Sequence, residues 1–273
     1  MGASKVFRVM PRIIVEKLEL PREAYDFLAR DRIYAAYAIG SLATEKASCT
    51  VLRALRDREE LSLALISQPI DTIATMFLMG DTVGLHESLR APFARIPFAL
   101  TTAKEEHLAC LRRYWRIEEA EMMLRMVVDR GGFRPPAEGK GIELRRLAPP
   151  DAMVLAETYE MAFGGTPSLA RLMERGPYFG VWDKGRLNSV AGTHFIAEHF
   201  RLAAAGNVWT RNGFRGKGLA TLTLGKVTQE LLEQCEEVVL NVREDNAAAR
   251  RVYEKLGFRM HCRFRQVRAK WRL

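Results

Sequence analysis

The stretch at residues 206–220, GNVWTRNGFRGKGLA, constrains the fold most strongly. Its first residues favour an extended strand, and the glycines that follow allow a tight turn that can approach a ligand closely. Beyond the turn, apolar residues recur along one face and predict a helix to about Gln234. Such a helix start offers unpaired N–H groups and a positive dipole end, and Arg215 and Lys217 add charge beside it. The stretch therefore predicts a site for an anion such as pyrophosphate.

Two familiar phosphate-binding motifs do not fit this stretch. Lys217 is followed by Gly218 and not by Ser or Thr, so the turn is not a P-loop. The stretch also lacks G-x-G-x-x-G after the first strand of a dinucleotide-binding unit. On its own, the pattern indicates an anion site and no particular reaction.

A second block, LNVREDNAAARRVYEKLGF, occupies residues 240–258. Asp245 or Asn246 is predicted to cap a helix that ends at Leu256, and Gly257 is the usual left-handed stop. Asn246 and Tyr253 fall on one face of that helix, so an amide and a phenol are predicted to point into one space. The alternative is that Asn246 only caps the helix and that Tyr253 packs with its hydroxyl satisfied.

Together and in this order, the two blocks resemble the acyl-CoA-binding core of the GCN5-related N-acetyltransferases, over about residues 142–264. The resemblance implies an α/β fold with a mixed central sheet flanked by helices. It also implies that the strand before the glycine turn pairs with the pantetheine arm of acetyl-CoA, that the turn holds the pyrophosphate, and that no metal takes part. The implied cofactor-binding residues are Val208, Trp209, Thr210, Arg215, Gly216, Lys217, Gly218, Leu219, Ala220, Asn246 and Tyr253.

The implied reaction is N-acylation, most often acetylation, of an amine acceptor by direct attack through a tetrahedral intermediate. A backbone N–H near Val208 or Trp209 would stabilise the oxyanion, and Tyr253 would protonate the leaving thiolate. Glu198, just after the strand that precedes the cofactor strand, is predicted to be the general base. The other candidate bases are His194, His199, Glu157 and Glu160.

Glycines and prolines crowd into residues 131–141, GGFRPPAEGKG, and predict a linker. It would separate an N-terminal α/β domain, 1–130, from an acetyltransferase domain, 142–273. This layout resembles FR47-like and glycine N-acyltransferase-like proteins, in which the N-terminal half is a related but degenerate copy. Since the N-terminal half lacks an R-x-x-G-x-G/A turn, we expect it to shape the acceptor site or brace the fold, and not to bind a second cofactor.

Local patterns predict further elements, although no internal repeat is evident. The segment 117–128 fits a strand or a helix. Asp81 is predicted to cap a short helix through Leu89. Helices are also predicted over 21–37, 104–114 and from 150 or 151 to about 163, and strands over 60–66, 72–79, 142–147, 179–182, 186–195, 203–209 and 237–242.

The net charge of +9 favours a polyanionic ligand, which a phosphorylated cofactor satisfies. The basic residues are scattered and form no nucleic-acid motif, which argues against a nucleic-acid partner. In the segment 267–272 apolar and basic residues alternate, which favours a strand with one solvated face over a binding patch. The four cysteines lack metal-ligand spacing and indicate reduced thiols.

No apolar run approaches the length of a membrane helix, and no leader-like segment opens the sequence, so we expect a cytoplasmic protein without membrane contact. A homodimer is compatible with this layout. One rival interpretation is a catalytically inactive acyl-CoA-binding or regulatory module. A basic nucleic-acid-binding protein is the less favoured one.

Overall fold

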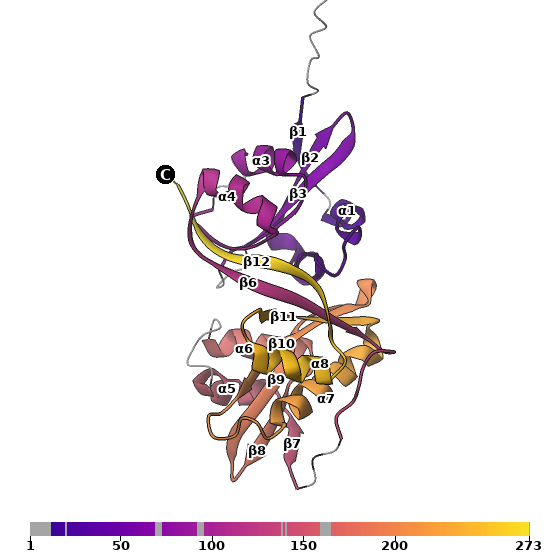
Figure 1. Ribbon diagram of the computed structural model, residues 1–273, viewed down its shortest axis with the longest axis vertical. Helices are drawn as coiled ribbons and strands as arrows, with labels where there is room; N and C mark the ends of the chain where they lie inside the picture. The colour runs from indigo at the N-terminus through magenta and orange to yellow at the C-terminus, as the bar shows by residue number, and fades with distance from the viewer. Residues whose placement is uncertain are drawn as a thin grey trace, which may run out of the picture.

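The computed structural model describes residues 12–19, 21–68, 73–91, 96–137, 139, 141–158 and 165–272. One mixed sheet of 12 strands, in the order β1-β2-β3-β4-β5-β12-β6-β11-β10-β9-β8-β7, runs through the molecule. Helices flank it in two lobes, and the long strands β6 and β12 cross between the lobes (Figure 1). The predicted α/β class with a mixed, helix-flanked sheet is confirmed.

The N-terminal lobe is formed by the residues before the linker. Its elements are β1 (Ile14–Lys17), η1 (Pro21–Ala24), α1 (Tyr25–Ala29), α2 (Ala36–Thr44), η2 (Lys46–Ser48), β2 (Cys49–Arg56), β3 (Glu59–Ser67), β4 (Thr75–Gly80), α3 (Thr82–Arg90), β5 (Phe98–Ala103), η4 (Glu105–His107), α4 (Leu108–Tyr114) and β6 (Trp115–Asp129).

The C-terminal lobe follows the predicted pattern closely. Its elements are β7 (Glu143–Arg146), η5 (Pro149–Asp151), α5 (Ala152–Thr158), α6 (Gly165–Arg175), β8 (Phe179–Asp183), β9 (Arg186–Ala197), η6 (Glu198–Phe200), β10 (Leu202–Thr210), α7 (Leu219–Gln234), β11 (Glu237–Arg243), α8 (Ala247–Lys255) and β12 (Arg259–Trp271). The end of the helix predicted to reach about residue 163 lies outside the described residues.

The two halves repeat one succession of strands and helices. Each half has a first strand, a helical segment, three strands, and then helix, strand, helix and strand. Exchanging β1–β6 for β7–β12 reverses the strand order onto itself, so a pseudo-twofold axis passes between β6 and β12. The duplication that is not evident in the sequence is therefore evident in the fold.

The last strand of each half pairs inside the sheet of the other half. The strand β12 follows the predicted linker, yet it lies between β5 and β6, which precede the linker. In the same way, β6 pairs with β11 of the C-terminal half. Backbone hydrogen bonds therefore join the halves directly, and the division at 131–141 stays a prediction about the chain.

One local prediction for the N-terminal half needs correction, and one open alternative is resolved. The helix predicted over 21–37 is interrupted, because α1 ends at Ala29 and α2 begins at Ala36. In the turn between them, the Asp31 carboxylate accepts a hydrogen bond from the Tyr34 backbone N–H at 3.1 Å, which favours a local turn over a continuous helix. The ambiguous segment 117–128 is the strand β6.

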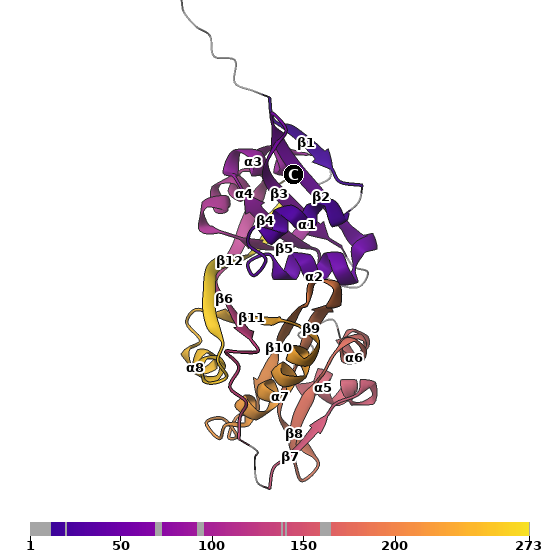
Figure 2. The ribbon, with the colours of Figure 1, turned by 90° about the vertical axis from the view of Figure 1, so that its right-hand side faces the viewer.

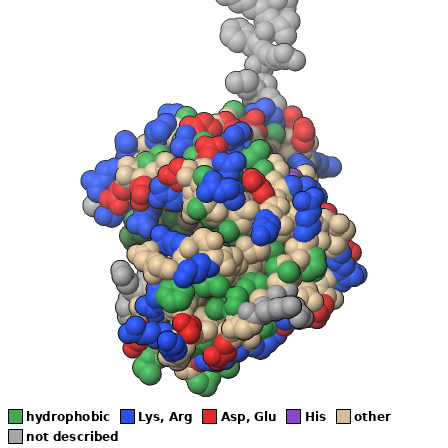
Figure 3. All heavy atoms as spheres, turned by 60° about the horizontal axis from the view of Figure 1, so that its bottom comes forward, with side chains coloured by type: hydrophobic (Ala, Val, Ile, Leu, Met, Phe, Trp, Pro, Cys, Tyr) green, Lys and Arg blue, Asp and Glu red, His purple; other side chains and the backbone are tan. Residues whose placement is uncertain are grey.

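The strand with alternating basic residues, β12, has the predicted buried and solvated faces. Val267 and Ala269 are fully buried, whereas Arg268 is exposed. Arg268 pairs with Glu119 at 3.5 Å, and Lys270 pairs with Glu118 at 2.8 Å. The basic residues at this end therefore belong to a salt-bridged sheet face. On the face shown in Figure 3, acidic side chains are interspersed among the basic ones.

The helix α2 connects the lobes and positions the site. It belongs to the N-terminal half but packs against β9 and β10 of the C-terminal half, as Figure 2 shows where the lobes meet. Its Ile39 is fully buried in a core cluster that also contains Phe195 and Ala204. A Cβ added at Gly40 would lie 2.6 Å from the Phe195 ring, so glycine allows this close approach.

Candidate active site

The strands β10 and β11 separate at the centre of the C-terminal lobe. They pair in parallel only from Leu202 to Ala204, although both strands continue beyond that point. The pairing of β10 with β9 is irregular between Gly206 and Trp209, where Asn207 has a φ of 52°. A bulge of this kind turns the strand and frees part of its backbone from the ladder. The resulting gap between β10 and β11 is suited to an extended ligand arm that pairs with the strand.

The glycine-rich turn after β10 leaves the start of α7 open. Gly213, Gly216 and Gly218 have φ values of 83°, 75° and 79°, and a Cβ added at any of them would meet nothing within 4 Å. Gly218 is the N-cap of α7 and supplies no side-chain cap. The N–H groups of the first turn and the positive dipole end therefore face open space, which fits a pyrophosphate. Arg215 and Lys217 are exposed beside it.

Tyr253 and Asn246 lie on α8, as predicted, but their environments differ. Tyr253 is only 6% exposed, and burial raises its pKa to about 12. Asn246 is exposed, and its Oδ1 accepts a hydrogen bond from the Ala249 N–H at 3.1 Å. Asn246 thus caps the helix, which leaves its amide N–H₂ as the group available to a ligand.

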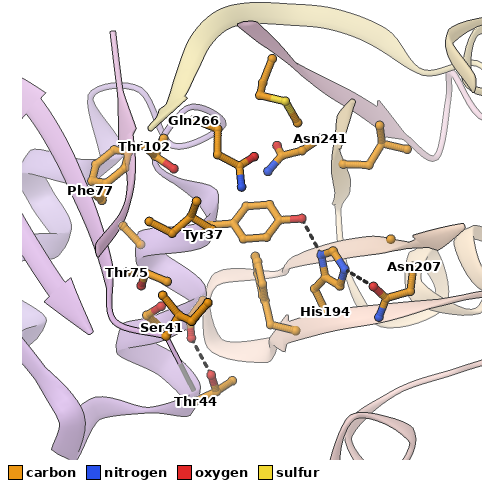
Figure 4. A pocket seen from close by; sticks show the side chains of 18 of the residues that line it. Tyr37, Ser41, Thr44, Thr75, Phe77, Thr102, His194, Asn207, Asn241 and Gln266 are labelled. Atoms are coloured by element: carbon orange, nitrogen blue, oxygen red, sulfur yellow. Dashed lines mark hydrogen bonds between the residues drawn. The ribbon is translucent and has the colours of Figure 1, made fainter. Parts of the chain in front are cut away.

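A cavity of about 750 Å³ lies where β10 and β11 separate, and it continues to the N-terminal lobe. Figure 4 shows side chains from both lobes converging on it. The C-terminal lining residues are His194, Phe195, Gly206, Asn207, Val208, Trp209, Leu240, Asn241, Tyr253 and Gln266. The N-terminal lining residues are Tyr37, Ala38, Gly40, Ser41, Thr44, Glu45, Leu65, Ile73, Thr75, Met76, Phe77, Leu100, Thr102 and Met123.

The structure brings some of the predicted site residues together at this cavity. Val208, Trp209 and Tyr253 line it. Thr210 follows at the end of β10, where its hydroxyl lies 2.9 Å from that of Ser189. The remaining predicted cofactor residues, 215–220, form the glycine turn and the start of α7.

Most of the candidate bases lie elsewhere. Glu198 begins η6, where the chain reverses after β9, and is not among the described residues that line the cavity. His199 packs edge-on against Phe200 in the same turn. Glu157 lies on α5, and Glu160 lies outside the described residues. Among these candidates His194 lines the cavity, and the prediction for Glu198 stays untested.

A hydrogen-bonded chain that sequence reasoning missed crosses the cavity wall. The Tyr37 hydroxyl is 2.7 Å from His194 Nδ1, and His194 Nε2 is 3.1 Å from Asn207 Oδ1. Asn207 Nδ2 donates to the Tyr178 hydroxyl at 2.8 Å, and that hydroxyl donates to the Thr193 carbonyl at 3.1 Å. Tyr37 and His194 are 157 residues apart, so no local pattern could reveal the contact.

Comparison with known proteins finds one matching family and several solved structures of similar fold. Residues 144–258 match the family described as the acetyltransferase (GNAT) family. Among solved structures, a protein from Drosophila superposes with a TM-score of 0.70 at 13% identity, over 96% of this chain and 99% of its own. A GCN5-related N-acetyltransferase from Sphaerobacter thermophilus does so with a TM-score of 0.62 at 19% identity, over 96% and 97%.

A tandem GNAT protein from the clavulanic acid biosynthesis pathway shares the fold of both halves, with a TM-score of 0.58 at 12% identity over 94% of this chain and 98% of its own. No curated protein matches the chain. Among the described residues, no group of three or more His, Cys, Asp or Glu side chains is placed to hold a metal ion. None of the described helices has the length and apolar character that crossing a bilayer requires.

The family match covers the strand–turn–helix unit and the helix that carries Tyr253, which together form the site described above. The structural neighbours extend the fold to the N-terminal half. Residues 144–258 are therefore similar to the acetyltransferase (GNAT) family, and both halves of the chain share the fold of the tandem GNAT protein.

Proposed function

We propose that this acyl-CoA-dependent N-acyltransferase transfers an acetyl group from acetyl-CoA to an amine. One observation supports this most directly: the gap between β10 and β11 leads into the cavity that Tyr253 lines, and the open glycine turn follows β10 at this same, C-terminal end of the strand. An acyl-CoA needs both an anion site and a groove for its arm. The residues present fit both parts.

In this proposal the turn and the strand divide the work of binding the donor. The N–H groups at the start of α7 bind the pyrophosphate, with charge support from Arg215 and Lys217. The backbone of Val208, Trp209 and Thr210 pairs with the pantetheine arm, because β11 does not occupy that edge of β10. Leu219 and Ala220 continue the first turn of the helix, and Asn246 offers its amide N–H₂.

The transfer itself would be direct attack of the amine on the thioester carbonyl, through a tetrahedral intermediate. A backbone N–H near Val208 or Trp209 would stabilise the oxyanion. Tyr253 would donate its proton to the leaving sulfur. Since burial raises the Tyr253 pKa to about 12, the phenol remains protonated at neutral pH and can act as the acid.

The division of the chain at 131–141 and a cytoplasmic location complete the proposal. Residues 142–273 would carry the donor site, and residues 1–130 would face the acceptor. The lining of the cavity supports this division of roles, because most residues opposite β10 come from the N-terminal half (Figure 4).

Two measurements test the proposal. Calorimetric titration with acetyl-CoA reports binding, and release of free CoA thiol with a panel of amines reports transfer. Tyr253→Phe should lower kcat about 10²-fold, judged from typical general-acid contributions. Tyr114→Phe is the matched control, because the Tyr114 hydroxyl contacts His86 and does not line the cavity. Binding without thiol release from any amine would instead favour an inactive acyl-CoA-binding module.

A further inference from the structure

The charge of the cavity wall contrasts with the charge of the chain. The protein has 42 Lys and Arg residues and a net charge of +9. Among the described residues that line the cavity, none is Lys or Arg, and Glu45 is the one carboxylate. The described lining of the cavity is therefore neutral or acidic, although the chain as a whole is basic.

Neutral hydrogen-bonding groups take the place of charge on this wall. Hydroxyls come from Ser41, Thr44, Thr75 and Thr102, and side-chain amides come from Asn241 and Gln266 (Figure 4). Asn241 is half-buried, and its Oδ1 has no hydrogen-bond partner. A buried carbonyl oxygen of this kind is stabilised by a donor such as an N–H or an O–H.

On the basis of the proposed function, we propose that the acceptor is a small polar amine without a carboxylate or phosphate, bound against this neutral wall of the cavity. An anionic group there would lose its hydration without a cation in the lining to pair with, which is costly, because the buried Arg125 lies behind the Tyr37 ring and does not line the cavity. A hydroxyl or a second amine would meet the hydroxyl and amide groups or Glu45. The volume of about 750 Å³, shared with the acyl end of the donor, suits a small molecule.

Matched acceptors test this inference on the full-length protein. Agmatine against arginine and ethanolamine against phosphoethanolamine differ by one anionic group each. With acetyl-CoA as donor, kcat/KM should favour the member without the anion at least about 10-fold, since a desolvated unpaired charge costs more than one tenfold step. Ranking the same amines by the rise in Tm that they cause in the presence of CoA keeps the comparison independent of turnover.

Two variants sharpen the test. Gln266→Lys places a cation on the cavity wall and should reduce the ratio of kcat/KM between the acceptors without and with the anionic group. Glu45→Gln should lower kcat/KM for the doubly cationic acceptor agmatine and leave that for ethanolamine unchanged. Equal or better use of the anionic members by the unmodified protein would overturn the inference while leaving the transferase intact. Absence of thiol release with every amine would count against the proposed function, and the Tm ranking would still decide the acceptor class.

The hydrogen-bonded chain behind the cavity carries a second, independent inference. A backbone carbonyl can only accept, so Tyr178 must donate to the Thr193 carbonyl. Asn207 must then direct its N–H₂ to Tyr178 and its oxygen to His194. His194 therefore carries its proton on Nε2, and its Nδ1 accepts the proton of Tyr37. The donor and the acceptor in each of these hydrogen bonds therefore follow from the Thr193 carbonyl, which can only accept.

We propose that Tyr37 and His194 together form the general base. The acceptor nitrogen gives its proton to Tyr37 Oη, while the proton of Tyr37 moves to His194 Nδ1 and forms an imidazolium. Tyr253 gives a proton to the sulfur, and after product release solvent removes the extra proton from His194 and restores that of Tyr253. One proton thus passes from nitrogen to sulfur in the net reaction. The relay rests on the proposed function, and it makes the N-terminal half a catalytic partner.

The surroundings keep both members of this pair neutral before the reaction. Burial lowers the pKa of His194, so its imidazole is neutral at neutral pH, and burial raises the pKa of Tyr37 to about 12. Among the described residues, Tyr178 and Tyr253 are neighbouring phenols of the pair, and both are neutral because burial raises their pKa values. Arg125 is fully buried with its guanidinium carbon 4.6 Å from the Tyr37 ring centre, and its charge partly offsets the rise.

Kinetics test the relay with the best amine of the panel. Tyr37→Phe and His194→Gln should each lower kcat about 10²-fold, the usual general-base contribution. The double variant should be no slower than the singles, because residues that act as one unit are not additive. Tyr114→Phe and His86→Gln remove another Tyr–His contact, away from the cavity, and should leave kcat unchanged.

Nitrogen-15 NMR of the histidines tests the tautomer without any substrate. His194 should show a protonated Nε2 and a pKa below its ordinary value, because it is buried, and Asn207→Asp should raise this pKa, because a carboxylate stabilises the imidazolium. A proton on Nδ1, additive losses in the double variant, or a Tyr37→Phe protein as active as the unmodified one would overturn the relay. Loss in Glu198→Gln alone would identify Glu198 as the base. Thiol release that still depends on Tyr253 would show that the proposed function survives.

Discussion

The two strand–helix junctions β10–α7 and β4–α3 occupy equivalent positions in the duplicated fold. They differ in whether a protein carboxylate caps the start of the helix. After β10, a glycine-rich turn leaves the helix start without a side-chain cap. After β4, the chain enters α3 through Asp81, whose carboxylate accepts from the N–H groups of Val83 at 2.7 Å and Gly84 at 3.3 Å. The second junction therefore supplies its own anion, and the first leaves that position to a ligand.

The gap between β4 and β5 also differs from the gap between β10 and β11, because protein side chains bond to the backbone beside it. The strands β4 and β5 pair in parallel only from Thr75 to Phe77, much as β10 and β11 do. In the N-terminal half, however, the Tyr34 hydroxyl donates to the Leu78 carbonyl at 2.8 Å, and His107 Nε2 donates to the Gly80 carbonyl at 3.1 Å. Protein side chains thus occupy the backbone groups that a ligand arm would use. The duplication is consistent with the proposal that one copy binds the donor while the other shapes the acceptor site.

The largest expected effect comes from placing an aspartate N-cap, as found at the β4–α3 junction, at the β10–α7 junction. Gly218→Asp places a carboxylate at the N-cap of α7, where the pyrophosphate is proposed to bind. Two like charges about 5 Å apart at an effective dielectric constant of about 20 repel by roughly 3 kcal/mol, so Kd for acetyl-CoA should rise about 10²-fold. Calorimetry measures the change.

Gly185→Asp is the control for that substitution. Gly185 also has a positive φ, 73°, and open space around its Cβ position, but it lies in the β8–β9 turn. The backbone strain is similar and the added charge is remote from the site. Equal weakening by both variants would mean that strain, and not the anion site, determines the loss.

An intermediate effect, on stability, is expected from removing the Tyr34 hydroxyl that bonds to the backbone of β4. Tyr34→Phe leaves the Leu78 carbonyl buried without its donor, which should lower the free energy of unfolding by about 1–3 kcal/mol. Urea unfolding measures this loss, and the affinity for acetyl-CoA should not change. Appearance of a second acetyl-CoA site in this variant would show that a single hydroxyl blocks the N-terminal copy.

The smallest effect concerns the cap itself. Asp81→Ala removes the side-chain cap of α3 and should cost about 1 kcal/mol of unfolding free energy, with acetyl-CoA binding retained. Asp183→Ala, an exposed aspartate at the end of β8, is the control and should stay within about 0.5 kcal/mol of the unmodified protein. A drop in acetyl-CoA affinity on loss of Asp81 would contradict the separation of roles between the junctions.

Local chemistry explains which parts of this arrangement are predictable from the sequence. The glycine turn before α7, the cap at Asp81 and the helix with Tyr253 each depend on residues within one turn or helix, and all are found where predicted. The sequences of β2 and β5 carry no distinctive pattern, so local patterns do not predict these strands. The insertion of β12 between β5 and β6 depends on pairing across more than 100 residues, which no local signal encodes.

The candidate site divides in the same way. The donor side lies in consecutive blocks and is predictable as a family pattern. The acceptor side depends on α2 packing onto β9 and β10, which brings Tyr37 to His194 only in the folded chain. The prediction of Glu198 relied on proximity in sequence to the cofactor strand, whereas the cavity is defined by proximity in space.

The stoichiometry of acetyl-CoA binding tests the central claim most directly, namely that one copy of the fold binds the donor and the other has closed its equivalent site. Calorimetric titration should give one site per chain in the unmodified protein and in Asp81→Ala, and about 10²-fold weaker binding in Gly218→Asp. Two sites per chain, or one site that persists in Gly218→Asp and is lost in Asp81→Ala, would contradict the account.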